Sequence, residues 1–196
     1  IDVNGNTLTV ESAITGGGAT YGVSGIDVNG GTLELNNGGS FAGSIFDTGV
    51  GGLLDVGADA GGGTFTLGGE IDDVDMTITS GTLRTNGYSL GGNGSLGVLT
   101  NAGTMYINGG DTVTTATQVD GGGTFSFEVD SAAATGLLTV TGGAFDMTTS
   151  TITAVVGTGN IANGDEILIV DGSATIVGGP GGVATAVTES SFLWDF

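Results

Sequence analysis

The chain repeats one short pattern, and that repeat constrains its fold more than any other feature. A Thr opens each copy, and apolar and polar residues then alternate, as in Thr7-Leu8-Thr9-Val10 and Thr104-Met105-Tyr106-Ile107. The openers are Thr7, Thr32, Thr64, Thr82, Thr104, Thr124 and, with a changed first residue, Ala144. Alternation with a period of two indicates half-buried β-strands, and a repeat of about 20 to 25 residues is typical of the coils of a β-solenoid.

The repeat predicts an all-β fold: a right-handed parallel β-helix (β-solenoid) with a C-terminal capping β region. Right-handedness is expected because crossovers between parallel strands almost always have that hand. Equivalent residues of adjacent coils should stack about 4.8 Å apart. The inward column of this alignment is Leu8, Leu33, Phe65, Leu83, Met105, Phe125 and Phe145. The outward column next to it is Thr9, Glu34, Thr66, Arg84, Tyr106, Ser126 and Asp146.

Glycines lie at the expected corners of the coils. A Gly precedes every opener except the first, and Asn-Gly pairs such as Asn29-Gly30 lie between the alternating runs. We expect these glycines to adopt the positive φ that a tight corner requires, since only Gly does so at no steric cost.

The pattern changes towards the C-terminus, where the alternating runs lengthen. We therefore divide the chain into residues 1–118, which form coils of about 20–25 residues, and residues 119–196, which form C-terminal coils and a cap. Strands are expected at 183–188 and at the aromatic terminus, 191–196. Phe192, Trp194 and Phe196 share one face of the terminal strand. They either plug the open end of the core or form an assembly edge that pairs with another subunit.

The composition excludes most catalytic chemistry. The chain has no His, Cys or Lys, so it has no Ser-His-Asp triad, ordinary zinc site, P-loop or Schiff-base lysine. Arg84 is the only basic side chain against 21 Asp and Glu residues, and the formal net charge is −20. Nucleic acid and anionic membranes would be repelled. We expect no enzymatic activity, no organic cofactor and no nucleic-acid partner.

Two charged features remain as candidate sites. The stretch Glu70-Ile71-Asp72-Asp73-Val74-Asp75 is a solvated turn, a Ca²⁺ site formed by Asp72, Asp73 and Asp75, or a source of paired carboxylates for glycoside hydrolysis. Arg84 is either a surface charge or the binding group for a carboxylate ligand. In the outward column it would lie two rungs from Glu34, about 10 Å away.

The C-terminal sequence resembles a known family. The relevant pieces are Gly122-Gly123-Thr124-Phe125-Ser126-Phe127-Glu128-Val129, Leu137-Leu138-Thr139-Val140-Thr141-Gly142, Gly164-Asp165-Glu166-Ile167-Leu168-Ile169-Val170 and Ser191-Phe192-Leu193-Trp194-Asp195-Phe196. In order and spacing they resemble the autochaperone segment of pertactin-like autotransporter passengers. The resemblance implies a β-helix displayed outside a Gram-negative cell, a C-terminal segment that folds first, and a membrane-embedded translocator barrel in the same polypeptide as partner. The integrin-type Arg-Gly-Asp tripeptide and acidic-protease motifs of that family are absent from the sequence.

These observations favour an extracellular structural protein. The first hypothesis is a rigid stalk with an adhesive or biofilm role toward a host or matrix ligand. The second is a self-assembling filament or sheath subunit joined through its terminal strands, with Ca²⁺ screening the repulsion between chains. The third is a β-helix enzyme that processes polysaccharides.

Overall fold

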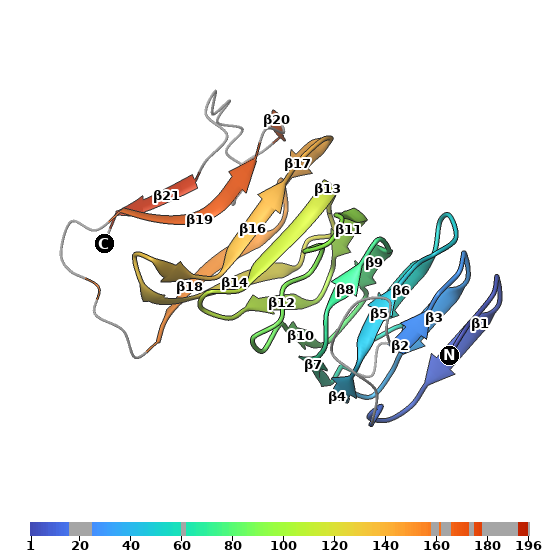
Figure 1. Ribbon diagram of the computed structural model, residues 1–196. Coiled ribbons are helices and arrows are strands. Elements are labelled where there is room, and N and C mark those ends of the chain that lie inside the picture. Colours follow the sequence, from blue (N-terminus) through green and yellow to red (C-terminus); the bar gives the residue numbers. More distant parts are fainter. Residues whose placement is uncertain are drawn as a thin grey trace.

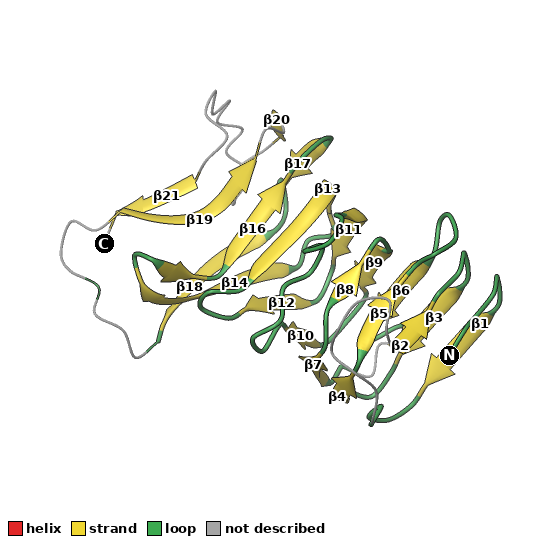
Figure 2. Cartoon of the chain, in the orientation of Figure 1, coloured by secondary structure: helices red, strands yellow, loops and turns green. Residues whose placement is uncertain are grey.

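A computed structural model describes residues 1–15, 25–59, 62–157, 161, 166–172, 175–177 and 192–195. These residues contain strands and turns and no helix (Figure 2). Parallel strands stack as a β-solenoid of about six turns, from β1 near the N-terminus to β19 at the opposite end (Figure 1). The predicted all-β solenoid is therefore confirmed.

Each full coil has three sides, which we call faces A, B and C. Face A contains β1 (Thr7–Val10), β3 (Thr32–Leu35), β6 (Leu53–Val56), β9 (Asp75–Ile78), β11 (Leu96–Asn101), the second half of β13 (Thr112–Asp120), β17 (Ala144–Asp146) and β20 (Thr175–Val177). Face B contains β4 (Gly39–Ala42), β7 (Thr64–Gly68), β10 (Thr82–Arg84), β12 (Thr104–Ile107), β14 (Thr124–Ser131) and β18 (Thr151–Val156). A short strand, β15 (Ala134–Thr135), pairs antiparallel with β14.

Face C contains β2 (Gly25–Asp27), β5 (Ser44–Phe46), β8 (Ile71–Asp72), the first half of β13, β16 (Leu137–Val140) and β19 (Glu166–Gly172). Single bridges through Leu90 join β8 to β13 on this face. Since β13 pairs with β16 by its first half and with β11 by its second, it spans the corner between two faces. The expected boundary between residues 118 and 119 falls inside this strand.

The three-sided coil corrects the predicted columns. Leu33 pairs with Leu8 and with Leu54, so its column continues on face A and does not reach Phe65. Phe65 lies on face B, where it begins a run with Leu83, Met105 and Phe125. Phe145 is on face A again, next to Gln118. The alignment failed because the same alternation occurs on two faces of each coil, and a local pattern does not distinguish them.

One apolar core runs through the stack. It extends from Val3 to Val170, and each fully buried aliphatic or aromatic side chain contributes about 1.5 to 3 kcal/mol. Phe41 and Phe65 stack with their ring centroids 5.8 Å apart. Two polar residues, Asn101 and Gln118, are fully buried in coils that adjoin each other, and the Oδ1 and Oε1 atoms of these residues have no hydrogen-bond partner.

The glycines before the openers have a different role from the predicted one. Gly81 has a positive φ of 74°, whereas Gly63, Gly103 and Gly123 do not. A Cβ on Gly103 would lie 2.7 Å from the carbonyl oxygen of Gly81, and one on Gly123 would lie 2.5 Å from that of Gly103. These glycines are required because the backbones of successive coils approach closely there. The predicted positive φ is confirmed in the Asn-Gly corners, such as Asn29 (45°) and Gly30 (71°).

The C-terminal end of the stack carries a change in strand direction. β21 (Phe192–Asp195) pairs antiparallel with β19, whereas β19 pairs parallel with β16 (Figure 1). The expected terminal strand is thus present, and it covers the edge that β19 would otherwise expose. The strand expected at 183–188 lies outside the described residues.

Candidate functional site

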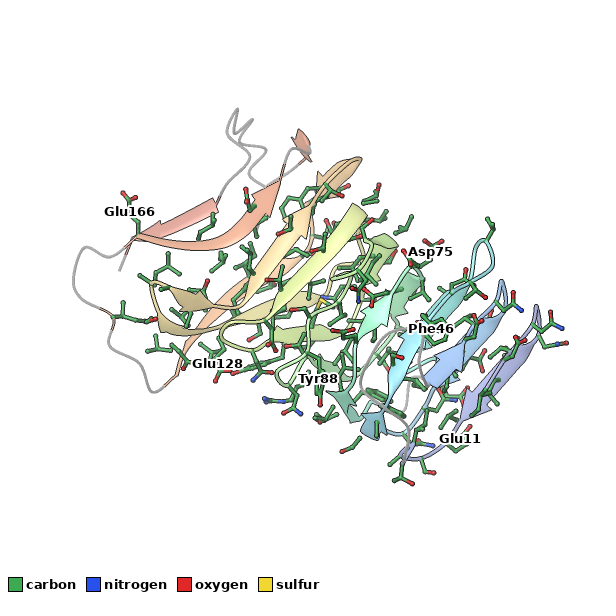
Figure 3. All side chains as sticks on the ribbon, in the orientation of Figure 1. Glu11, Phe46, Asp75, Tyr88, Glu128 and Glu166 are labelled. Atoms are coloured by element: carbon green, nitrogen blue, oxygen red, sulfur yellow. The ribbon has the colours of Figure 1, made fainter. Side chains whose placement is uncertain are left out.

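The acidic stretch that suggested a metal site binds backbone and amide groups of the following coil. Asp72 is fully buried, and its Oδ1 accepts a hydrogen bond from the backbone N–H of Asn93 at 3.1 Å. The side-chain amide of Asn93 donates to Glu70 Oε2 at 3.2 Å. Asp75, on the upper edge of the stack in Figure 3, accepts from the N–H of Val98 at 2.8 Å.

Asp73 has a different local role in the same stretch. Its φ of 58° places it in the left-handed region, so it forms the corner between β8 and β9. Over the described ranges, no group of three or more Asp and Glu side chains is placed to hold a metal ion. The three residues of the calcium hypothesis therefore do not converge on a common point in that part of the chain.

The same use of carboxylates recurs along the solenoid. Carboxylates that accept a backbone N–H from a neighbouring coil include Asp27, Asp47, Asp72, Asp75, Asp111, Asp120 and Glu128. Corners leave N–H groups outside the strand ladders, and a buried N–H without a partner is costly. The acids therefore join successive coils at their corners, and we call them the corner carboxylates.

Asp47 binds a long corner, the one between β5 and β6. Its Oδ1 accepts from the N–H groups of Gly30 at 2.8 Å and Gly49 at 3.0 Å, and its Oδ2 accepts from Gly52 at 2.9 Å. The side chain is 7 % exposed. It thus links the corner of its own coil to that of the preceding coil with three hydrogen bonds.

A second network lies at the corner between faces B and C. The buried Thr85 hydroxyl donates to Asp111 Oδ2 at 2.5 Å, and the same oxygen accepts from Gly87 N–H at 2.8 Å. Glu128, labelled left of centre in Figure 3, accepts from the Asn108 side chain at 2.8 Å. Three successive coils are connected in this way.

Two of the corner carboxylates have shifted pKa values. Burial raises the pKa of Asp72, against the lowering effect of its hydrogen bonds from Asn93, and the charges of Glu70 and Asp73 raise it further. Partial burial also acts to raise the pKa of Asp120, but hydrogen bonds from Ser150, Thr149 and Gly122 outweigh it and lower the pKa to about 2. Asp120 is therefore held as an anion by its neighbours.

Arg84 lies on the outer side of face B. It pairs in register with Thr66 and Tyr106, and its guanidinium carbon is 4.1 Å from the centre of the Tyr106 ring. Glu34 lies on face A between Thr9 and Asp55, so the predicted proximity of two rungs is wrong. No carboxylate among the described residues forms an ion pair with Arg84. A cation–π contact replaces the ion pair expected of a lone cation in an acidic chain.

The aromatic candidates lie at the C-terminal end. In β21, Phe192 pairs with Val170 and Trp194 with Ile167 of β19 in the same chain. Phe196 lies outside the described residues. The structure thus brings the terminal strand to the end of the stack opposite the N-terminus, several strands from β8 and β10, which contain Asp72 and Arg84 (Figure 1).

Comparison of the chain with models of protein families, with curated proteins and with solved structures gave no match. No described segment is a helix long and apolar enough to cross a membrane.

The corner carboxylates were not recognised as a set from the sequence. A local signal existed, because Asp27 and Asp120 each accept an N–H from two residues further on, the spacing of an Asx turn. The second N–H comes from 21 residues away for Asp27 and 29 for Asp120. This second donor can be identified only when the pairing of strands between coils is known.

Proposed function

We propose that the chain is a rigid stalk of an extracellular display protein, the C-terminal part of an autotransporter passenger on a Gram-negative cell. The observation that carries the proposal is the single apolar core from Val3 to Val170, covered at its end by the antiparallel strand β21. A stack of parallel strands with corners joined by carboxylates resists bending, and its length separates a binding tip from the cell. The stalk supports an adhesive or biofilm role.

The proposed order of folding has support in the strand lengths. β13 and β14 have nine and eight residues, the longest of the described strands. β14 also forms a local antiparallel pair with β15, and a short loop closes faster than a full coil. The C-terminal coils therefore provide a nucleus on which the N-terminal coils stack.

Surface display is tested by labelling intact cells of the producing organism with an antibody against residues 1–196. Labelling before permeabilisation supports the proposal. Labelling that requires permeabilisation refutes it. The order of folding is tested separately by pulsed hydrogen exchange during refolding, in which amides of β13 to β16 should be protected before those of β1 to β6; the reverse order refutes the nucleus.

The filament alternative requires the outer edge of β21, because the other edge of this strand already pairs with β19 of the same chain. It predicts growth of particles when Ca²⁺ screens the charge of −20. Light scattering of the purified chain during a Ca²⁺ titration distinguishes the two, since a stalk stays monomeric. Release of no reducing ends from neutral and acidic polysaccharides would exclude the enzymatic hypothesis.

A further inference from the structure

The outer side of face B differs from the rest of the acidic surface. The register brings one threonine per coil into a column: Thr64, Thr82, Thr104, Thr124 and Thr151. A second column, two residues along each strand, consists of Thr66, Arg84, Tyr106, Ser126 and Thr153. Rungs are about 4.8 Å apart and the columns about 6.6 Å apart, so the hydroxyl groups form a regular array, in which Ser126 is buried. Neither column contains an acidic residue, although the chain has 21.

The guanidinium of Arg84 lies within this array. Its central carbon lies 4.1 Å from the centre of the Tyr106 ring, and it forms no ion pair with a carboxylate among the described residues. An acid on this face is Glu128, whose carboxylate interacts with the Tyr106 hydroxyl. A guanidinium presents a planar fork of N–H donors that matches a carboxylate with two parallel hydrogen bonds. Since this fork has no carboxylate partner among the described residues, it can bind one from outside the chain.

We propose that this surface, centred on Arg84 and Tyr106, binds a uronate-containing saccharide. The uronate carboxylate binds the guanidinium, and the ring hydroxyls bind the threonine hydroxyls of the neighbouring rungs. Because the chain has a net charge of −20, a polymer of dense negative charge is repelled, whereas a saccharide in which isolated uronates alternate with neutral sugars is not. The proposal concerns the purified chain and does not depend on surface display.

The experiment uses the fact that Arg84 is the only arginine and that the chain has no lysine. In a ¹⁵N-labelled sample the arginine Nε–Hε group gives a single cross-peak, which reports on this site alone. We would titrate the chain with a disaccharide of glucuronate and a neutral hexose, and in separate samples with the neutral disaccharide, with acetate and with heparin.

The proposal predicts that the uronate disaccharide shifts the Arg84 Nε–Hε peak and the amides of β7, β10, β12 and β14. Arg84→Gln should abolish the shifts, and Arg84→Lys should weaken binding at least tenfold, since Lys keeps the charge without the fork. Thr100→Val, on face A, is the matched control and should bind like the parent. Retained amide dispersion shows that each variant is folded.

Three results would overturn the proposal. The first is the absence of any shift at saturating uronate disaccharide. The second is acetate or heparin that binds as tightly as the disaccharide, which would indicate simple anion binding. The third is an undiminished set of shifts in Arg84→Gln, which would place the ligand elsewhere.

Discussion

Replacement of Asp47 tests the role of the corner carboxylates most sharply, because this side chain accepts three backbone N–H groups. In Asp47→Ala the N–H of Gly52, which is buried, loses its partner, whereas Gly30 and Gly49 are exposed and can bind water. A stranded buried donor costs about 1 to 3 kcal/mol, and each exposed hydrogen bond contributes about 0.5 kcal/mol. The free energy of unfolding should fall by about 3 kcal/mol.

Asp47→Asn separates geometry from charge. The amide keeps one acceptor oxygen and places an NH₂ group against an N–H donor, so we expect about half the loss seen with Ala. Glu166→Gln is the matched control, because Glu166 is exposed at the far end of the stack (Figure 3) and the substitution removes the same charge. It should change stability by less than about 0.5 kcal/mol.

The assay is urea unfolding followed by circular dichroism, with thermal melting as a second measurement. For a chain of this length, 1 kcal/mol corresponds to about 2 to 4 °C in Tm, so Asp47→Ala should melt about 6 to 12 °C lower. If Asp47→Ala and Glu166→Gln were equally stable, the carboxylates would be ordinary surface charges and the reasoning would be wrong.

Three further predictions concern the stack. Gly103→Ala should lose about 1 to 3 kcal/mol in urea unfolding, because the new Cβ meets the Gly81 carbonyl at 2.7 Å. Gly92→Ala should be neutral, because its Cβ would meet only the Ser89 Cβ at 4.0 Å, and equal losses would contradict the close approach. Gln118→Leu should change the free energy of unfolding by less than about 1 kcal/mol, because the removal of a buried oxygen without a partner offsets the loss of the 2.8 Å hydrogen bond from Nε2 to the Val119 carbonyl, and a loss above about 2 kcal/mol would show that the oxygen is satisfied. The folded pKa of Asp120, about 2, lies below the ordinary 3.8, so its stabilisation is present above pH 4 and is lost as the pH falls to 2. The stability difference between the parent and Asp120→Asn should therefore shrink over that range, and a constant difference would refute the shift.

The sequence predicted the fold class because each strand carries its own signal. Alternation in Thr104–Ile107 and the Asn-Gly corners are local, and the structure confirms both. The assignment of strands to faces was wrong because Thr32-Leu33-Glu34-Leu35 and Thr64-Phe65-Thr66-Leu67 follow one pattern, yet they lie on different faces. Which strands pair is decided by corner lengths, such as the longer corner that Asp47 binds, and by packing across the core.

The candidate sites were less predictable than the strands. Asp72 and Asp75 attracted attention as a dense acidic cluster, but their partners are the N–H groups of Asn93 and Val98, more than 20 residues away. The predicted neighbours of Arg84 depended on which strands share a face. Because that assignment was wrong, Glu34 was placed in the column of Arg84 although it lies on another face. A residue whose contacts all come from adjacent coils is not interpretable until the register is known.

Disulfide cross-linking tests the three-sided register most directly, since the chain has no cysteine. In the structure Glu34 is the parallel neighbour of Asp55, and strands at this spacing bring Cα atoms within the range of a disulfide. The variant with Glu34→Cys and Asp55→Cys should therefore form an intramolecular disulfide under mild oxidation, detected by mass spectrometry. The variant with Glu34→Cys and Thr66→Cys should not. Cross-linking of the second pair instead of the first would contradict the three-sided solenoid.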